Sequence, residues 1–323
     1  MSESTAEVFR RMADDFEQGG SKLYASLARS LADDPLVEQL VGDHEPRWEA
    51  PLRLFGGVHY LELSGMVQHP WGKLRGVLEA NRDWLQRFVA EQPIQTNEVQ
   101  RCWGLLPGFL SAADGRVVDL IELGPSGGLN LFWDRYGYRY GEDRWGDEGA
   151  SLELAGRAEG GPPRELLSTS VEVGRRIGID RRPVDVSTDH GARLLEAFVW
   201  ADQTDRLERV RRAIEIARRD PPRLLDGDYV EVLPALLAGR NLDRLTVVYH
   251  SVSTVYLRGE ERDHLDAIFA EEGERGSLAR LSYEVDRDTP TFHGFALDLE
   301  LWPGGSMRLA RLDGHANSLE WVA

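Results

Sequence analysis

The stretch "VVDLIELGPSGGLNLFWDRY", residues 117–136, joins three patterns in direct succession. An apolar run of β-type residues comes first, a cluster of small residues follows, and an apolar run at helical spacing ends the stretch. This succession predicts a buried strand, a tight turn and a helix. Glu122 closes the predicted strand, and Gly124, Ser126 and Gly128 shape the turn.

Downstream of this turn, short β-rich runs alternate with amphipathic segments, which is typical of a parallel sheet covered by helices on both faces. The best helical stripe between strands covers about 194–219. The last two runs are joined by "PGG" and predict an antiparallel hairpin. The predicted strands are 117–123, 178–186, 223–228, 245–252, 278–285, 295–302 and 306–313.

The first part of the chain has a mainly helical period, and the segment 52–65 is ambiguous between strand and loop. We therefore expect an N-terminal helical cover region at 1–112 and a Rossmann-like α/β domain at 113–323. Residues 141–176 are rich in glycine and charge and exceed the usual length of a link inside a compact βαβ unit. We expect this segment to be an insertion or part of an active-site rim.

The segment "QTNEVQRCWGLLPGFLSA" is expected to open a new helix just before the first strand. Asn97 or Thr96 is expected to accept a hydrogen bond from the first free backbone N–H groups, and Glu98 suits the first turn. Because this helix leads directly into the first strand, Asn97 and Glu98 could also face a cofactor pocket.

The charge balance bears on the class of partner. The chain has 38 basic and 55 acidic residues, a formal charge of -17, and no basic cluster. Nucleic acid and anionic membranes are therefore not expected partners. No apolar run reaches the length of a membrane span, and the N-terminus lacks the apolar core of a signal peptide. We expect a cytoplasmic protein, and the oligomeric state is open.

Three other features narrow the chemistry. Lys22 and Lys73 are the only lysines, so the chain offers few attachment points for a Schiff base. Cys102 is the only cysteine, which excludes internal disulfides and a cysteine-based zinc site. The histidines are not arranged at metal-ligand spacing, so no metal is expected.

The glycine turn has two functional interpretations. In the first, Gly124, Ser126 and Gly128 form the G-x-S-x-G elbow of a serine hydrolase, with Ser126 as nucleophile. Asp228 followed by His293 or His315 would supply the acid and base in chain order. This interpretation also needs preceding strands, and the chain before the turn is mainly helical.

In the second interpretation, the turn is a cradle for a cofactor at the N-terminus of a helix. The dinucleotide fingerprint G-x-G-x-x-G is not met, because Ser126 and Leu129 occupy its second and third glycine positions, and the chain has no G-x-x-x-x-G-K-[ST] loop. A third interpretation gives the turn no ligand: it packs the helix tightly onto the sheet.

The second interpretation is supported by a resemblance. Glu122, Gly124 and Gly128, with Ser126 in place of a glycine, resemble the first motif of class I S-adenosylmethionine-dependent methyltransferases. The resemblance implies a Rossmann-like sheet that ends in an antiparallel hairpin and binds S-adenosylmethionine at this turn, with Asn130 close by.

The resemblance also assigns roles to later strands. It implies that Asp180 binds the ribose hydroxyls and that Asp228 lies near the adenine, while Tyr249 and His250 lie at the reaction site. His250 is the first choice for a general base. Asp180 follows Glu122 by 58 residues, which is longer than the family needs. Alternative ribose partners lie in the insertion: Glu142, Asp143 and Glu153.

At a finer level, the order of "QTNE", "ELGPSGGLNL", "GIDRRPVDV", "VWADQ", "VVYHSVSTVYL", "WPGG" and "GHANSLEW" resembles the bacterial domain of unknown function 2332 family over nearly the whole chain. That family carries no established activity. The expected function is therefore methyl transfer from S-adenosylmethionine to a small-molecule acceptor. The alternatives are a serine hydrolase and a noncatalytic Rossmann-like ligand-binding protein.

Overall fold

A computed structural model describes residues 3–42, 44–286 and 294–323. The chain divides into two compact units, each built from two segments of the sequence. Unit 1 comprises residues 1–96 and 184–211, and unit 2 comprises residues 97–183 and 212–323. This division assigns 97–112 and 184–211 differently from the two-part division expected from the sequence.

Unit 1 is built from amphipathic helices. The first begins with a capping box, in which Ser4 accepts from the N–H of Glu7 and the Glu7 carboxylate accepts from the N–H of Ser4. Its apolar face contributes Phe9, Met12 and Phe16 to the core. The helices are α1 (Thr5–Gln18), α2 (Lys22–Leu31), α3 (Pro35–Val41), α4 (Glu49–Leu63), η1 (Trp71–Lys73), α5 (Leu74–Ala80), α6 (Arg82–Glu91) and α9 (Asp189–Ala197).

Helix α4 corrects the expectation for residues 52–65, which are neither strand nor loop. The pair Gly56 and Gly57 lowers the helical propensity of this segment. Both glycines are required by close helix packing, because a Cβ on Gly56 would lie 3.0 Å from the ring of Phe198 and one on Gly57 3.0 Å from Leu85. Tertiary packing therefore stabilises this segment as a helix despite its low helical propensity.

The helix expected over 194–219 is broken into α9 and α10 (Thr204–Arg219), which runs from unit 1 into unit 2. The break contains Asp202, whose carboxylate accepts from the hydroxyl of Ser21 at 2.6 Å and from the N–H of Leu23 at 3.0 Å. These bonds tie the break to the start of α2.

Unit 2 is built on a nine-stranded sheet of order β5-β12-β11-β10-β9-β8-β1-β6-β7. Strands β7, β6, β1, β8 and β9 are parallel, and β10, β11 and β12 follow in antiparallel pairing. The strands are β1 (Val118–Leu123), β5 (Arg157–Glu159), β6 (Val173–Asp180), β7 (Arg223–Asp226), β8 (Leu245–Ser251), β9 (Leu278–Val285), β10 (Phe295–Trp302), β11 (Ser306–Leu312) and β12 (Ser318–Trp321). The predicted α/β class, mostly parallel sheet and C-terminal antiparallel hairpin are confirmed.

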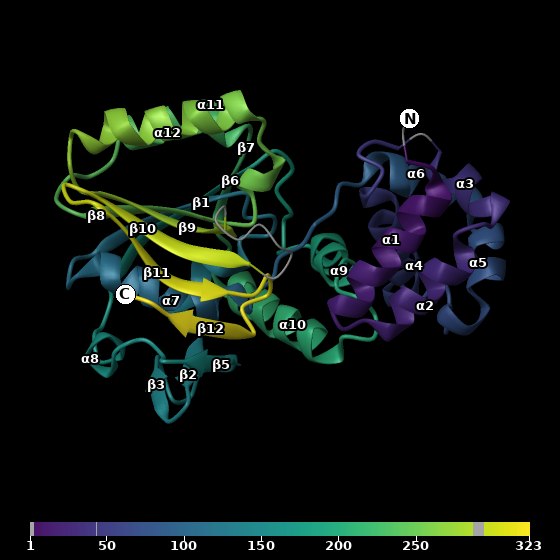
Figure 1. Cartoon of the computed structure of the whole chain (residues 1–323), viewed down its shortest axis with the longest axis horizontal. Coiled ribbons are helices and arrows are strands. Elements are labelled where there is room, and N and C mark those ends of the chain that lie inside the picture. The colour runs from purple at the N-terminus through teal and green to yellow at the C-terminus, as the bar shows by residue number, and fades with distance from the viewer. Residues whose placement is uncertain (1–2, 43, 287–293) are drawn as a thin grey trace. The chain divides into compact units, whose positions relative to one another are not determined.

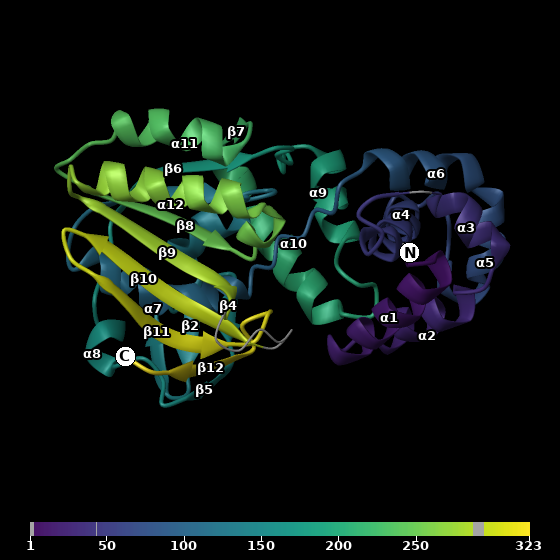
Figure 2. The same ribbon diagram turned by 45° about the horizontal axis from the view of Figure 1, so that its top comes forward.

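Helices cover both faces of this sheet. Figures 1 and 2 show α11 (Tyr229–Ala238) and α12 (Gly259–Gly273) along one face and α7 (Arg101–Ala113) on the other. Alternate residues of β1 and β8 therefore face different helices. If the five parallel strands are numbered by their order along the chain, they lie across the sheet in the order 3-2-1-4-5. This is the strand order of a doubly wound Rossmann-like fold.

The segment between β1 and β6 is structured. It contains η2 (Leu129–Arg135), β2 (Gly137–Tyr140), β3 (Asp143–Trp145), β4 (Glu153–Ala155) and α8 (Arg164–Leu167), and β2, β3 and β4 form a small separate sheet. The strand predicted at 178–186 lies earlier, at β6. It ends at Asp180, whose carboxylate accepts from the N–H of Arg182 and bends the chain.

Candidate functional site

The direction of chain winding reverses between β1 and β8. From β1 the chain winds toward β6 and β7, and it returns to place β8 and β9 on the other side. In register, Glu122 lies beside Tyr249, and Leu123 lies beside His250. Ligands of open α/β sheets bind outside the carboxyl ends of the strands at such a switch point. The glycine turn and residues 251–254 lie at this place.

The turn after β1 has a repeating backbone conformation. Gly124, Ser126 and Gly128 have φ angles of 72°, 54° and 72°, and the residues between them do not have positive φ. Alternation of this kind points successive N–H groups into one concavity, which favours an anion. Ser126 adopts this conformation without being glycine, so its substitution for glycine is compatible with the turn.

The structure fills the turn with side chains of its own. The N–H of Ser126 donates to Oδ2 of Asp180 at 2.8 Å, and the N–H of Leu129 donates to Oδ1 of Asn97 at 3.1 Å. Asp180 is half-buried at the carboxyl end of β6. Its carboxylate therefore takes the place of an anion at the turn.

This geometry corrects the expectation that Asn97 or Thr96 caps a helix. Helix α7 begins at Arg101, and its N-cap residue Gln100 makes no side-chain capping bond. Asn97 is buried and binds the glycine turn instead. Glu98 accepts from the N–H of Gln100 at 3.2 Å.

Glu122 lies in a buried cluster on the α7 side of the sheet. The hydroxyl of Tyr249 donates to Oε2 of Glu122 at 3.0 Å, and the side chain of Asn130 hydrogen-bonds to the same carboxyl group. Burial raises the pKa of Glu122 to about 8, and the charge of Asp180 acts in the same direction. Glu122 therefore keeps its proton at neutral pH. Cys102 lies within 3.3 Å of Oδ1 of Asn130 and is fully buried.

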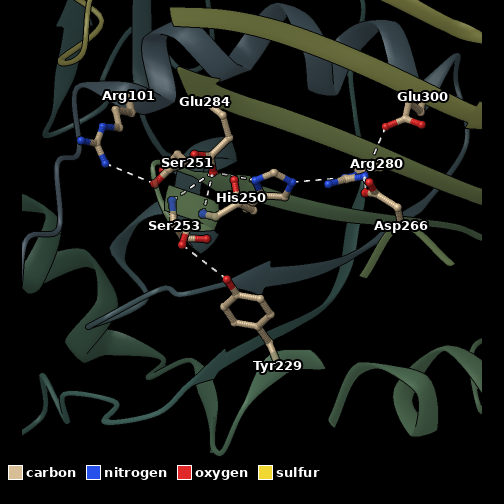
Figure 3. Close-up of polar contacts among 10 residues, drawn as sticks. Arg101, Tyr229, His250, Ser251, Ser253, Asp266, Arg280, Glu284 and Glu300 are labelled. Carbon is tan, nitrogen blue, oxygen red and sulfur yellow. Dashed lines mark hydrogen bonds and ion pairs between the residues drawn. The ribbon is translucent and has the colours of Figure 1, made fainter. Parts of the chain in front are cut away.

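His250 lies on the opposite face, in an ionic cluster (Figure 3). Its Nδ1 is 2.7 Å from Oε1 of Glu284, and Nε of Arg280 donates to its Nε2 at 3.2 Å. Because Nε2 accepts from Arg280, Nδ1 is the ring nitrogen that faces the Glu284 carboxylate as donor. Arg280 is also ion-paired with Asp266 at 2.6 Å and with Glu300 at 3.5 Å.

Glu284 organises the segment that follows β8. Besides His250, its Oε1 accepts from the N–H groups of Ser253 at 3.0 Å and Thr254 at 3.2 Å. Burial acts to raise the pKa of Glu284, but these hydrogen bonds and the contact with His250 outweigh it and hold the pKa below its ordinary value. Ser253 in turn packs on the glycine turn, because a Cβ on Gly124 would lie 2.9 Å from the Cβ of Ser253.

The remaining predicted residues lie in varied surroundings. Asp228 caps α11 through the N–H of Val230 at 2.9 Å and pairs with Arg181 at 2.5 Å. The alternative ribose partners belong to the small sheet or its turn: Asp143 pairs with Arg164, and Glu153 lies near two arginines. Asp180 is thus the acid that the structure brings to the glycine turn.

Among the described residues, no acid and base are seen assembled at Ser126 as a hydrolase elbow would need. The positive φ of Ser126 is compatible with an elbow, but its proposed acid Asp228 is held by Arg181. The predicted base His293 lies outside the described residues. The backbone N–H of His315, the other predicted base, donates to Asp313 in the turn before β12.

Sequence reasoning missed three residues of this region: Glu284, Ser253 and Arg101. Nη1 and Nε of Arg101 donate to the carbonyls of Ser251 at 3.3 Å and Gly314 at 3.2 Å. The only sequence signal was positional, since Glu284 is the penultimate residue of one predicted strand and Ser253 directly follows another. In the described part of the chain, no three His, Cys, Asp or Glu side chains gather as metal ligands would.

None of the described helices is both long enough and apolar enough to cross a bilayer. Comparison with curated proteins gives no match. Residues 6–321 match the model of a family described as uncharacterised protein conserved in bacteria, DUF2332. This match covers nearly the whole chain, and the chain therefore belongs to the DUF2332 family.

Proposed function

We propose that unit 2 binds S-adenosylmethionine at the carboxyl ends of β1, β6 and β8 and transfers its methyl group to a small-molecule acceptor. One observation carries the proposal: the carboxylate of Asp180 occupies the concavity of the glycine turn. This arrangement discriminates among the nucleotide-like cofactors that a Rossmann-like sheet can hold.

Cofactors with a phosphate place it on the N–H groups of such a turn. Here a carboxylate already accepts from Ser126, and a phosphate would add a second negative charge beside it. NAD, FAD and ATP are disfavoured for this reason. S-adenosylmethionine has no phosphate, and its sulfonium carries a positive charge.

The residues present fit the ribose of this cofactor. Each oxygen of Asp180 accepts one backbone N–H, from Ser126 and from Arg182. A carboxylate has about four acceptor sites, so two remain for ribose hydroxyl donors. Asp228, partly exposed at the start of α11, would lie on the adenine side. Binding also requires Ser253 to move off Gly124.

Glu122 has a supporting role in this proposal. It is 2 % exposed and keeps a proton, so it holds Tyr249 and Asn130 beneath the turn rather than offering a charge to the ligand. The sequence expectation placed Glu122 against the cofactor, and the geometry favours Asp180 for that contact.

The cofactor supplies an activated methyl group, and the protein aligns it with the acceptor. His250 is fully buried, and Arg280 occupies its Nε2. It accepts a proton from an acceptor only when Arg280 is displaced. Tyr249 is also fully buried and donates to Glu122, so its proposed part is to shape the floor of the site.

Calorimetric titration of the whole chain with S-adenosylmethionine, S-adenosylhomocysteine and NAD tests the proposal. We expect binding of the first two in the micromolar range and no binding of NAD. Binding of NAD with equal affinity would contradict the argument from Asp180. Absence of binding by all three, with a folded sample, would contradict the proposed cofactor.

A noncatalytic ligand-binding domain is the second candidate. The packing of Ser253 on Gly124 favours it, because the chain itself closes part of the switch point. Incubation with labelled S-adenosylmethionine and a pool of metabolite acceptors separates the two. Cofactor binding without transfer to any acceptor would support the noncatalytic domain.

A further inference from the structure

A cavity of about 130 Å³ lies in unit 2 near the amino ends of β1, β6 and β7, at the other edge of the sheet from the glycine turn. Its apolar wall includes Ile121 and Ile177 from the sheet and Leu236 from α11. The glycine turn, Asp180 and residues 251–254 do not line it.

The polar groups of this cavity are mostly cationic. Arg175, Arg223 and Arg240 line it, together with Thr246 and a single carboxylate, Asp119. Asp119 is already neutralised, because it pairs with Arg175 at 3.0 Å and with Arg244 at 3.3 Å.

The polar groups of this cavity that lack a protein partner are guanidinium N–H donors and one hydroxyl. Nε of Arg240 and the hydroxyl of Thr246 are buried without a hydrogen-bond partner in the described chain. Arg223 is exposed where it lines the cavity, and it has neither an ion pair nor a side-chain hydrogen bond with any described residue. Buried polar groups normally have partners, so the Nε of Arg240 and the hydroxyl of Thr246 call for a ligand that supplies acceptors.

The partial negative charge at the C-terminus of α11 would repel an anion, but Arg240 offsets it. Nη1 of Arg240 donates to the carbonyl of Leu237 in the last turn and pairs with Glu272 at 2.5 Å. The last-turn carbonyls of α11 are therefore partly neutralised. Arg223, on the adjoining strand, keeps a positive charge that no described carboxylate balances.

We propose that this cavity binds a short-chain carboxylate, with the carboxylate at Arg223 and the alkyl tail against Ile177 and Leu236. A water occupies about 30 Å³ in the liquid, so the volume suits a ligand of about four to six non-hydrogen atoms. The apolar wall favours a carboxylate with an alkyl tail over inorganic phosphate. The site is separate from the proposed cofactor site and does not depend on it.

Saturation-transfer NMR of the full chain with propionate tests the proposal. Propionamide, which has the same shape and no charge, is the matched ligand control. We expect saturable binding of propionate and at least about tenfold weaker binding of propionamide, since hydrogen bonds to charged groups are the stronger ones. Equal binding of the two, or no saturable signal from propionate, would overturn the proposal.

Variants locate the site. We expect Arg223→Gln to weaken propionate binding at least about tenfold, whereas Arg262→Gln on α12, away from the cavity, leaves it unchanged. Thr246→Val removes the unpartnered hydroxyl, and we expect it to raise the melting temperature of the free protein while weakening binding. Binding unchanged in both Arg223→Gln and Thr246→Val would overturn the site. Displacement of propionate by equimolar inorganic phosphate would overturn the choice of ligand class.

Discussion

Tyr249 and His250 are consecutive residues of β8, yet they belong to two buried polar clusters of opposite character. On the α7 side, Tyr249 binds a protonated Glu122 together with Asn130. On the α12 side, His250 binds an ionised Glu284 and Arg280. Both carboxyl groups lie near strand ends at the same sheet edge. The difference teaches that the supply of donors, and not burial alone, decides whether a buried acid keeps its charge.

The largest expected effect is opposite pH dependence of the two clusters. The pKa of Glu122 is about 8 in the folded chain and near 4.5 when unfolded, so its contribution is complete below pH 4.5 and is lost as the pH rises through 8. The limit of this loss is on the order of 5 kcal/mol. Glu284, whose pKa is lowered, contributes above its unfolded pKa and loses its contribution as the pH falls through the folded value.

Urea unfolding of the full chain between pH 4 and 9 measures both contributions. We expect Glu122→Gln to flatten the decline in stability from pH 4.5 to 8, and Glu284→Gln to flatten the acid limb. An unaltered alkaline slope in Glu122→Gln would show that Glu122 is ionised in the folded chain.

The next prediction compares Glu284→Gln with Glu122→Gln, two substitutions on opposite faces of the sheet. At pH 6, Glu284→Gln removes the charge that holds His250 and two backbone N–H groups, and we expect a loss of about 3 kcal/mol. Glu122→Gln resembles the protonated acid and needs no proton uptake on folding, so at pH 6 we expect no loss and a gain of up to about 2 kcal/mol. Glu271→Gln, exposed on α12, is the control. Equal losses at Glu122 and Glu284 would remove the distinction between the clusters.

A smaller effect is expected where the glycine turn contacts the segment after β8. Gly124→Ala places a Cβ 2.9 Å from Ser253 at a φ of 72°, and we expect a loss of about 2 kcal/mol. Gly115→Ala has nearly the same φ, 75°, and open space around its Cβ. Thermal unfolding of the two variants isolates the contact. Equal melting temperatures would mean that Ser253 does not press on the turn.

Much of the fold could be predicted from the sequence, because parallel strands are local apolar runs with turns between them. The limits of β9 and β10 match the prediction, and β1 begins one residue later than expected. Helix α4 could not be predicted from the sequence, because Gly56 and Gly57 lower the helical propensity of this segment. The two glycines are explained only by the packing of Phe198 and Leu85 against them in the folded chain. The short strands between β1 and β6 were missed for a similar reason, since β5 exists only by pairing with distant β12.

The site was predicted in part. Asp180 was chosen from the resemblance to class I methyltransferases, and the structure brings it to the glycine turn at the end of β6. The role of Glu284 depends on three partners spread over residues 250–254, which are brought to it by pairing of β8 with β9. Strand alternation alone does not reveal such a contact, and the sequence therefore left His250 as a candidate general base or a hydrogen-bonded core histidine.

The central claim is that Asp180 makes the glycine turn a site for S-adenosylmethionine. The most direct test is calorimetric titration of this ligand into the wild-type chain, Asp180→Asn, and the control Asp243→Asn, whose exposed side chain lies just before β8. We predict micromolar binding by the wild type and the control, and at least about tenfold weaker binding by Asp180→Asn, because a charged acceptor for two hydroxyls is lost. Equal affinity of all three proteins would contradict the claim.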